Sequence, residues 1–116
     1  MAAVGDDCLF CRIVSGEIPA DVVAETDHAV AFRDLDPQAP LHVLVVPRLH
    51  AADAADLADQ APEAVAALVG LGRQVASGEG HESYRLVFNT GGDAGQTVFH
   101  AHLHVLAGRS MSWPPG

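Results

Sequence analysis

The sequence predicts an α+β domain in which five antiparallel strands form one sheet, with one long and one short helix to one side of it. Five short segments of apolar or alternating residues are separated by turns rich in Pro and Gly, as expected for strands. A stretch rich in Ala, Leu, Asp and Glu lies between the third and fourth segments, which indicates a helix. At 116 residues the chain is long enough for one core, so a single domain over residues 1–116 is predicted, with a flexible N-terminus at 1–6 and a tail at 110–116.

The first half of the chain is predicted to hold the short helix and three strands. Residues 8–15 form the helix, because Gly16 follows at the position where a glycine often ends one. The strand segments are 22–25, 28–34 and 41–46, and the first two are expected to pair as a hairpin. Two prolines exclude residues 36–40 from regular pairing, so that stretch is a loop.

The second half begins with the long helix, expected within residues 53–77. Pro62 suits its first turn, apolar residues then recur at spacings of three and four, and glycines end it; these positions are Val65, Leu68, Val69, Gly72, Gly78 and Gly80. Residues 83–89 alternate as a fourth strand. A glycine-rich loop at 90–96 leads into the fifth strand at 99–106.

Three histidines alternate with apolar residues in the fifth strand. Side chains of a strand alternate between its two faces, so His100, His102 and His104 share one face. Neighbours on that face lie roughly 6.5–7 Å apart, so adjacent imidazoles converge on one metal or one phosphate. The outer two are about 13 Å apart, and the row is therefore expected to divide its tasks.

The charge and hydropathy of the chain exclude several classes of partner. A net charge of −9, with only six Lys and Arg and no basic patch, argues against a nucleic-acid surface. The apolar runs are too short to span a bilayer, and no basic segment of a signal peptide opens the chain, so a cytoplasmic protein is expected. An anionic ligand would have to be bound by backbone N–H groups and neutral side chains.

Four further segments accompany the histidine row. They are Asp-Leu-Asp-Pro-Gln-Ala-Pro at 34–40, His-Val-Leu-Val-Val-Pro at 42–47, Gly-Gln-Thr-Val-Phe at 95–99 and Trp-Pro-Pro-Gly at 113–116. With His-Ala-His-Leu-His-Val-Leu at 100–106, they resemble the histidine triad (HIT) superfamily, and specifically its Hint branch of purine nucleoside phosphoramidases.

The resemblance implies a covalent mechanism. His102 would attack the α-phosphorus of a nucleotide and form a nucleotidyl-histidine that water hydrolyses, which replaces one difficult step with two easier ones. The backbone carbonyl of His100 would accept a hydrogen bond from the His102 ring, and His104 and His42 would contact the phosphate. Two related readings stay open: a dinucleoside polyphosphate hydrolase, and a purine nucleotide-binding or scaffold protein with little turnover.

The resemblance also implies the nucleotide contacts. Asp34 would accept from the ribose hydroxyls, and Asn89 would contact ribose or phosphate. Gln96 and Thr97 would donate to the α-phosphate from the glycine loop. The base would lie among Phe10, Ile13, Phe32 and Leu35.

The pair Cys8-x-x-Cys11 admits a redox pair, a disulfide or half of a zinc site. Related zinc-containing HIT proteins imply a structural zinc on Cys8, Cys11, His50 and His100, with free thiols or a disulfide as alternatives. A catalytic zinc on the three histidines of the row would leave the cysteines unexplained. The resemblance further implies a homodimer with a continuous sheet, in which the tail lies near the partner's active site.

Overall fold

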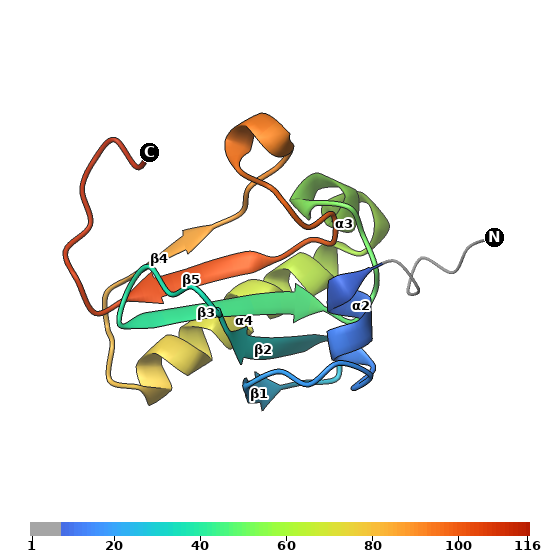
Figure 1. Cartoon of the computed structure of the whole chain (residues 1–116), viewed down its shortest axis with the longest axis horizontal. Coiled ribbons are helices and arrows are strands. Elements are labelled where there is room, and N and C mark those ends of the chain that lie inside the picture. The colour runs from blue at the N-terminus through green and yellow to red at the C-terminus, as the bar shows by residue number, and fades with distance from the viewer. Residues whose placement is uncertain (1–7) are drawn as a thin grey trace.

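The computed structural model describes residues 8–116, so the prediction for residues 1–6 lies outside the described part. One antiparallel sheet has the strand order β1-β2-β3-β5-β4 (Figure 1). The strands are β1 (Val22–Glu25), β2 (Ala29–Arg33), β3 (Leu41–Pro47), β4 (Tyr84–Val87) and β5 (Leu103–Ala107). The predicted fold class and the hairpin of the first two strands are confirmed.

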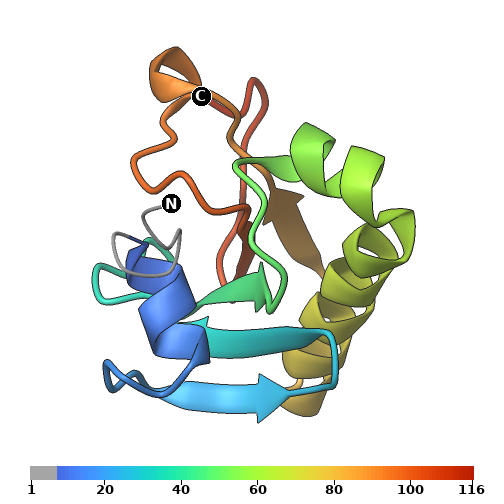
Figure 2. The same ribbon diagram turned by 90° about the vertical axis from the view of Figure 1, so that its right-hand side faces the viewer.

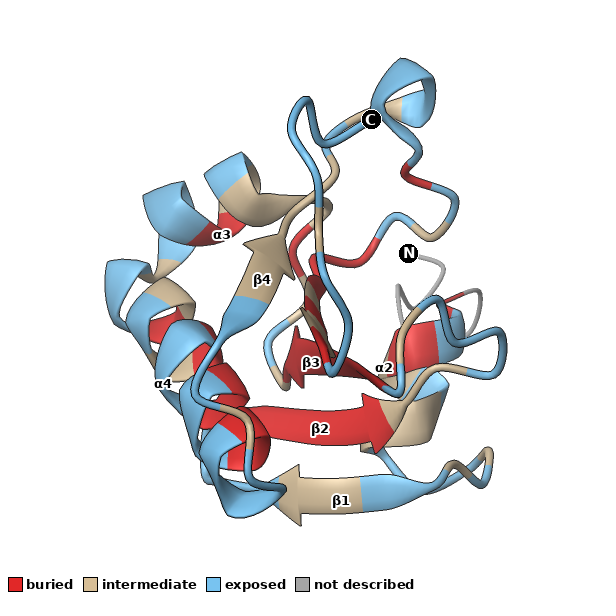
Figure 3. Cartoon of the chain, turned by 90° about the vertical axis from the view of Figure 1, so that its left-hand side faces the viewer, coloured by how far each residue is buried: buried red, intermediate tan, exposed pale blue. Residues whose placement is uncertain are grey.

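Helices cover both faces of the sheet. Helix α4 (Pro62–Gly78) packs on one face and α2 (Leu9–Val14) on the other (Figure 2). The expectation that the helices lie to one side is therefore wrong for α2. Strands β2 and β3 are apolar on both faces and buried along almost their whole length (Figure 3), so each face needs a cover.

The two-residue period of a strand divides the core into two clusters. Val43 and Val45 of β3 pack toward α4, whereas Leu44 and Val46 pack toward α2. His42 has the parity of Leu44 and Val46, so it lies on the α2 face. The side chains of His42 and His102 therefore lie on the face of the sheet that α2 covers.

The predicted long helix is α4, which begins at Pro62 and ends at Gly78 as expected, but the segment before it holds a helix of its own. A short helix α3 (Ala54–Gln60) precedes α4, and Asp53 begins it by accepting from the Asp56 N–H at 2.8 Å. Ala61 breaks the helical run because a residue before proline avoids the α conformation, and its φ of −155° and ψ of 81° are outside the helical region. None of the described helices is both long and apolar enough to cross a membrane.

Strand β5 begins at Leu103, after two of the three histidines. Val45 pairs with Leu103, so if the antiparallel register continued by two residues, Pro47 would pair with Ala101. A proline has no N–H to donate, and the Ala101 N–H bonds instead to the Ala51 carbonyl at 2.7 Å. The expectation of a strand from residue 99 is therefore wrong at its start, and only His104 lies within regular pairing.

Candidate functional site

Three imidazoles meet where β3 and β5 lie side by side. The ring centroid of His104 lies 5.1 Å from that of His102 and 5.2 Å from that of His42. His42 and His102 are 6% and 8% exposed, so both retain a small opening to solvent. The predicted catalytic residues are thus brought together on one face of the sheet.

The orientation of His102 is fixed by a backbone carbonyl. Its Nδ1 lies 2.8 Å from the carbonyl oxygen of His100. A carbonyl only accepts, so Nδ1 carries a hydrogen, and in the neutral ring Nε2 keeps its lone pair. The rings of Phe10 and His102 pack edge to face, with centroids 5.0 Å apart and planes at 85°, and this contact holds the imidazole from the α2 side. His102 therefore presents a nucleophilic nitrogen.

His42 contacts both His104 and Asp34. The His42 Nε2 lies 2.9 Å from the His104 Nδ1 and 3.4 Å from a carboxylate oxygen of Asp34. The backbone N–H of Gln38 donates to the other ring nitrogen of His42 at 3.0 Å. Sequence reasoning did not single out Gln38, although prolines at 37 and 40 leave few amide donors in that loop.

Burial keeps these two rings uncharged near neutral pH. It lowers the pKa of His104 to about 4, with His102 and His42 acting in the same direction and Asp34 opposing them. Burial also lowers the pKa of His42, against the attraction of Asp34 and Asp36. Neutral imidazoles donate or accept single hydrogen bonds, which suits contact with a phosphate oxygen.

An apolar hollow of about 180 Å³ lies between α2 and the edge of the sheet. Its lining includes Phe10, Ile13, Phe32, Leu35 and Asp34, which are the four residues predicted for the base and the one predicted for the ribose. The rings of Phe10 and Phe32 meet edge to face at 5.6 Å. Leu35 is fully exposed, so this wall is open to solvent.

A larger hollow of about 850 Å³ lies along β4 and the C-terminal segment. None of the predicted site residues lines it. Size alone would favour this hollow as a ligand site. The chemistry favours the smaller one, because the nucleophilic imidazole packs against its Phe10 wall.

The glycine loop includes a short 3₁₀ helix (Gly92–Ala94) and is held by Gln96. The Gln96 side chain is 3% exposed and accepts from the Gly91 N–H at 2.9 Å. Its amide nitrogen donates to the carbonyls of Ala52 and Val98 at 2.7 and 3.1 Å. Both amide hydrogens are used, so the predicted donation from this side chain to a phosphate is replaced by a structural role.

The other loop residues lie around the same segment. Asn89 follows β4, and its side-chain amide faces Gly95, whose φ of +99° is in the left-handed region. Thr97 is exposed. The side chains of Asn89 and Thr97 thus lie beside the loop, where they could contact a ligand.

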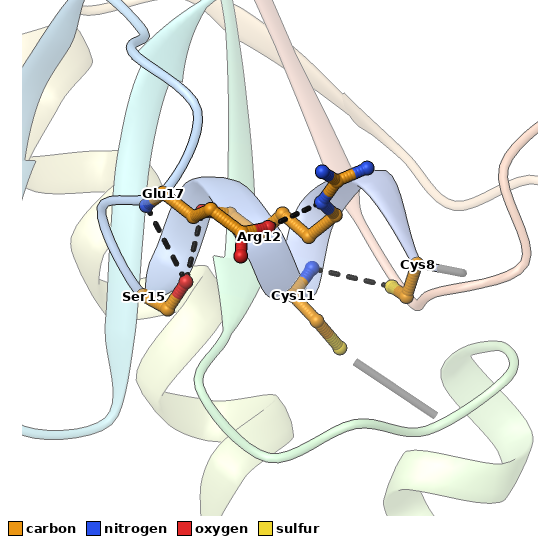
Figure 4. Close-up of polar contacts among 5 residues, drawn as sticks. All are labelled: Cys8, Cys11, Arg12, Ser15 and Glu17. Atoms are coloured by element: carbon orange, nitrogen blue, oxygen red, sulfur yellow. Dashed lines mark hydrogen bonds and ion pairs between the residues drawn. The ribbon is translucent and has the colours of Figure 1, made fainter. Parts of the chain in front are cut away.

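The Cys-x-x-Cys pair meets two histidines. One ligand atom each of Cys8, Cys11, His50 and His100 lies within 4.8 Å of all the others. Cys8 begins α2 and its sulfur accepts from the Cys11 N–H at 3.2 Å. Figure 4 shows this contact and the Cys11 side chain extending toward the segment after β3, which carries His50.

The spacing of these atoms suits a tetrahedral metal. Ligands on a zinc ion lie about 3.3–3.8 Å apart, given bonds of about 2.0 Å to nitrogen and 2.3 Å to sulfur. The Nδ1 of His100 lies 3.2 Å from the Cys8 sulfur, 3.4 Å from that of Cys11 and 3.1 Å from the His50 Nδ1. These distances are close to the edges of such a site.

The ring hydrogens of the cluster also suit a metal. The His100 Nε2 lies 3.0 Å from the Pro47 carbonyl, so it carries the hydrogen and leaves Nδ1 free to ligate. Burial lowers the pKa of His100 to about 4, which keeps this ring neutral. Burial and the contact with Cys8 raise the pKa of Cys11 to about 12, and a cation is what would favour the thiolate. The residues fit zinc.

The chain is similar to known proteins over almost its whole length. The HIT domain profile matches residues 15–111. An uncharacterised HIT-like protein of Synechococcus elongatus is 44% identical over 97% of this chain and all of its own length. A 14 kDa zinc-binding protein of Brassica juncea is 38% identical over 95% of this chain and all of its own.

A solved structure is equally similar. A HIT family hydrolase from Legionella pneumophila superposes with a TM-score of 0.89 at 48% identity, over 95% of this chain and 100% of its own. The chain therefore belongs to the HIT domain family.

Proposed function

We propose that this chain hydrolyses the P–N bond of purine nucleoside 5′-phosphoramidates through a covalent nucleotidyl-histidine on His102. The observation that carries the proposal is the contact of the His102 Nδ1 with the His100 carbonyl, which leaves Nε2 as a nucleophile. The apolar hollow beside that ring gives the base a place to bind. The similar Legionella pneumophila protein is itself described as a hydrolase.

The reaction proceeds in two balanced steps. The His102 Nε2 attacks the α-phosphorus, a P–Nε2 bond forms, and the bond to the leaving amine breaks as the amine takes a proton. Water then attacks the phosphorus and gives up a proton to solvent, the P–Nε2 bond breaks, the nucleoside monophosphate is released and free His102 is regenerated. His42 and His104 contact the phosphate, and Asp34 accepts from the ribose.

Zinc on Cys8, Cys11, His50 and His100 is proposed as structural. When bound it supplies a cross-link between α2 and the segments that carry the two histidines. This cross-link would hold Phe10, and with it one wall of the hollow. The name of the Brassica juncea relative is consistent with such a site.

A homodimer with a continuous sheet is proposed through β4. Within the described residues β4 pairs only with β5, so its other edge is open to a second copy. Trp113 in the tail is 82% exposed, and the adjacent Ser112 carbonyl accepts from Arg85 of β4 at 2.9 Å. Light scattering after gel filtration should give twice the mass of the chain; a monomer at tens of micromolar would contradict the proposal.

The test of function is hydrolysis of adenosine 5′-phosphoramidate by the purified protein beside His102→Ala. We expect turnover by the wild type and a loss of about 10³-fold or more in the variant. Retained activity in the variant would refute His102 as the nucleophile. An inactive wild type that binds AMP would favour a binding role, and faster cleavage of a diadenosine polyphosphate would favour that substrate class instead.

A further inference from the structure

We propose that the backbone N–H of Gln38 sets the ring-hydrogen positions of His42 and, through it, of His104, so that His104 offers an Nε2–H donor to the substrate. Gln38 is thus a positioning residue. The nature of that substrate rests on the proposed function, but the hydrogen positions do not, because they follow from contacts within the protein.

The Gln38 N–H determines which ring nitrogen of His42 carries the hydrogen. A backbone amide only donates, and the Gln38 N–H points at the His42 Nδ1 at 3.0 Å. That nitrogen therefore has no hydrogen of its own. Since burial lowers the pKa of His42, the ring is neutral near pH 7 and its single hydrogen is on Nε2.

Asp34 and His104 lie close to the His42 Nε2. A carboxylate oxygen of Asp34 lies 3.4 Å away and the Nδ1 of His104 lies 2.9 Å away. The carboxylate is an acceptor, so its position beside this nitrogen agrees with the hydrogen that the Gln38 contact places there. The shorter contact is then a hydrogen bond from His42 to the His104 Nδ1.

The contact with His42 in turn determines which ring nitrogen of His104 carries the hydrogen. Its Nδ1 accepts, so in the neutral ring the hydrogen is on Nε2. This is the opposite arrangement to His102, whose Nδ1 donates to a carbonyl and whose Nε2 is bare. Adjacent histidines of the row thus differ in chemistry: one presents a lone pair and the next presents a hydrogen.

The same contacts decide against a second metal site. One ligand atom each of Asp34, His42 and His104 lies within 4.8 Å of the other two, which is close enough for a cation. A metal on the His42 Nε2 would move the hydrogen to Nδ1, where it would face the Gln38 N–H. At the cysteine cluster the non-ligating nitrogen of His100 faces the carbonyl of Pro47 instead.

The loop that carries Gln38 is held from both ends. Asp34 accepts from the Asp36 N–H at 2.8 Å, and the Gln38 side chain donates to the Asp36 carbonyl at 2.9 Å. From the other side, Arg109 donates to the Gln38 carbonyl at 2.8 Å. These contacts aim the amide at His42 before any ligand binds.

The experiment is long-range ¹H–¹⁵N NMR of the intact, metal-loaded protein with ¹⁵N-labelled histidine, at pH 7 and without nucleotide. We expect His42 and His104 as Nε2–H tautomers and His102 as the Nδ1–H tautomer. An Nδ1–H signal from His42 or His104 would overturn the proposal even if the enzyme is active. Inactivity with the expected tautomers would overturn the proposed function alone.

Two variants separate the amide from the side chain. Gln38→Pro removes the N–H, whereas Gln38→Ala keeps it. We expect the proline variant to lose the defined His42 tautomer and roughly tenfold in kcat, and the alanine variant to keep the tautomers. Unchanged tautomers in a folded proline variant would overturn the proposal.

A backbone ester at position 38 and a metal titration complete the test. If the proline variant does not fold, the ester made by semisynthesis removes the same N–H with the side chain intact, and unchanged tautomers in it would also overturn the proposal. Added Zn²⁺ should saturate at one ion per chain; a second ion that is lost in Asp34→Asn would refute the exclusion of a metal from this cluster.

Discussion

Two glycines of α4 provide a matched test of how closely this helix lies behind β5. A methyl group at Gly72 would be 3.0 Å from a methyl of Val105 and 3.5 Å from Leu103, both of β5. At Gly70, two positions earlier in the same helix, it would meet nothing within 4 Å. Both changes to alanine have the same effect on helix propensity, so only the contact with the sheet differs.

The magnitudes follow from these two environments. Gly→Ala in a helix stabilises by about 0.5–1 kcal/mol, which is the whole effect expected at Gly70. At Gly72 overpacking of the core costs about 1–3 kcal/mol and outweighs that gain. The difference in free energy of unfolding between Gly70→Ala and Gly72→Ala should therefore be about 1–3 kcal/mol.

Thermal unfolding followed by circular dichroism measures this difference. An unfolding entropy of about 2.1 cal/mol/K per residue, over 116 residues, makes 1 kcal/mol equal to about 4 °C in Tm. Gly70→Ala should thus melt roughly 4–12 °C above Gly72→Ala, and above the wild type. Equal Tm values, or a more stable Gly72→Ala, would show that Val105 gives way and would refute the close approach.

The stability of the fold should also depend on pH, on a bound metal and on the contacts of the glycine loop. Stability to urea should fall as the pH drops from about 6.5 to 4. In the unfolded chain His104 takes up a proton below its ordinary pKa of 6.5, whereas in the folded chain it does so only near its lowered pKa of about 4. Equal stability at pH 7.5 and 4.5 would contradict this. Removal of zinc by a chelator should lower Tm, and Cys11→Ser should remove that response; an unchanged Tm on chelation would contradict a structural metal. Gln96→Ala should cost about 1–3 kcal/mol in urea unfolding by leaving three loop groups without partners, whereas Thr97→Ala, at an exposed position, should stay within about 0.5 kcal/mol; equal losses would refute the structural role of Gln96.

Features set by local sequence were predictable. The strand at 22–25 matches β1 at both ends, and the helix that starts after Cys8 ends before Gly16, whose φ is +83°. Each depends on residues within a few positions, such as a turn or a glycine in the left-handed region. The break at Ala61 was also local, since the proline after it carries the signal.

Features set by distant partners were not predictable in the same way. The start of β5 depends on Pro47, more than fifty positions earlier, which has no N–H to offer at that point of the ladder. The role of Gln96 depends on the Ala52 carbonyl, supplied from before α3. Neither partner can be identified from the sequence of the loop or of the strand, because both contacts join segments that are far apart in the chain and meet only in the tertiary structure.

His100 joins the cluster of Cys8, Cys11 and His50 to His102, the proposed nucleophile, and both nitrogens of its ring have partners. Its Nδ1 belongs to the cluster, its Nε2 bonds to Pro47, and its backbone carbonyl orients His102. A substitution of His100 would remove its side-chain contacts with the cluster and with Pro47, and these contacts also hold the carbonyl that orients His102, so its effect on rate would not separate the two roles. The other members of the cluster are Cys8, Cys11 and His50. Within the described residues none of them makes a hydrogen bond to His102, so their variants would isolate the contribution of a bound metal. Under the proposed function, the division of tasks expected from strand spacing assigns His100 to the metal, His102 to the attack on phosphorus and His104 to donation of a hydrogen bond.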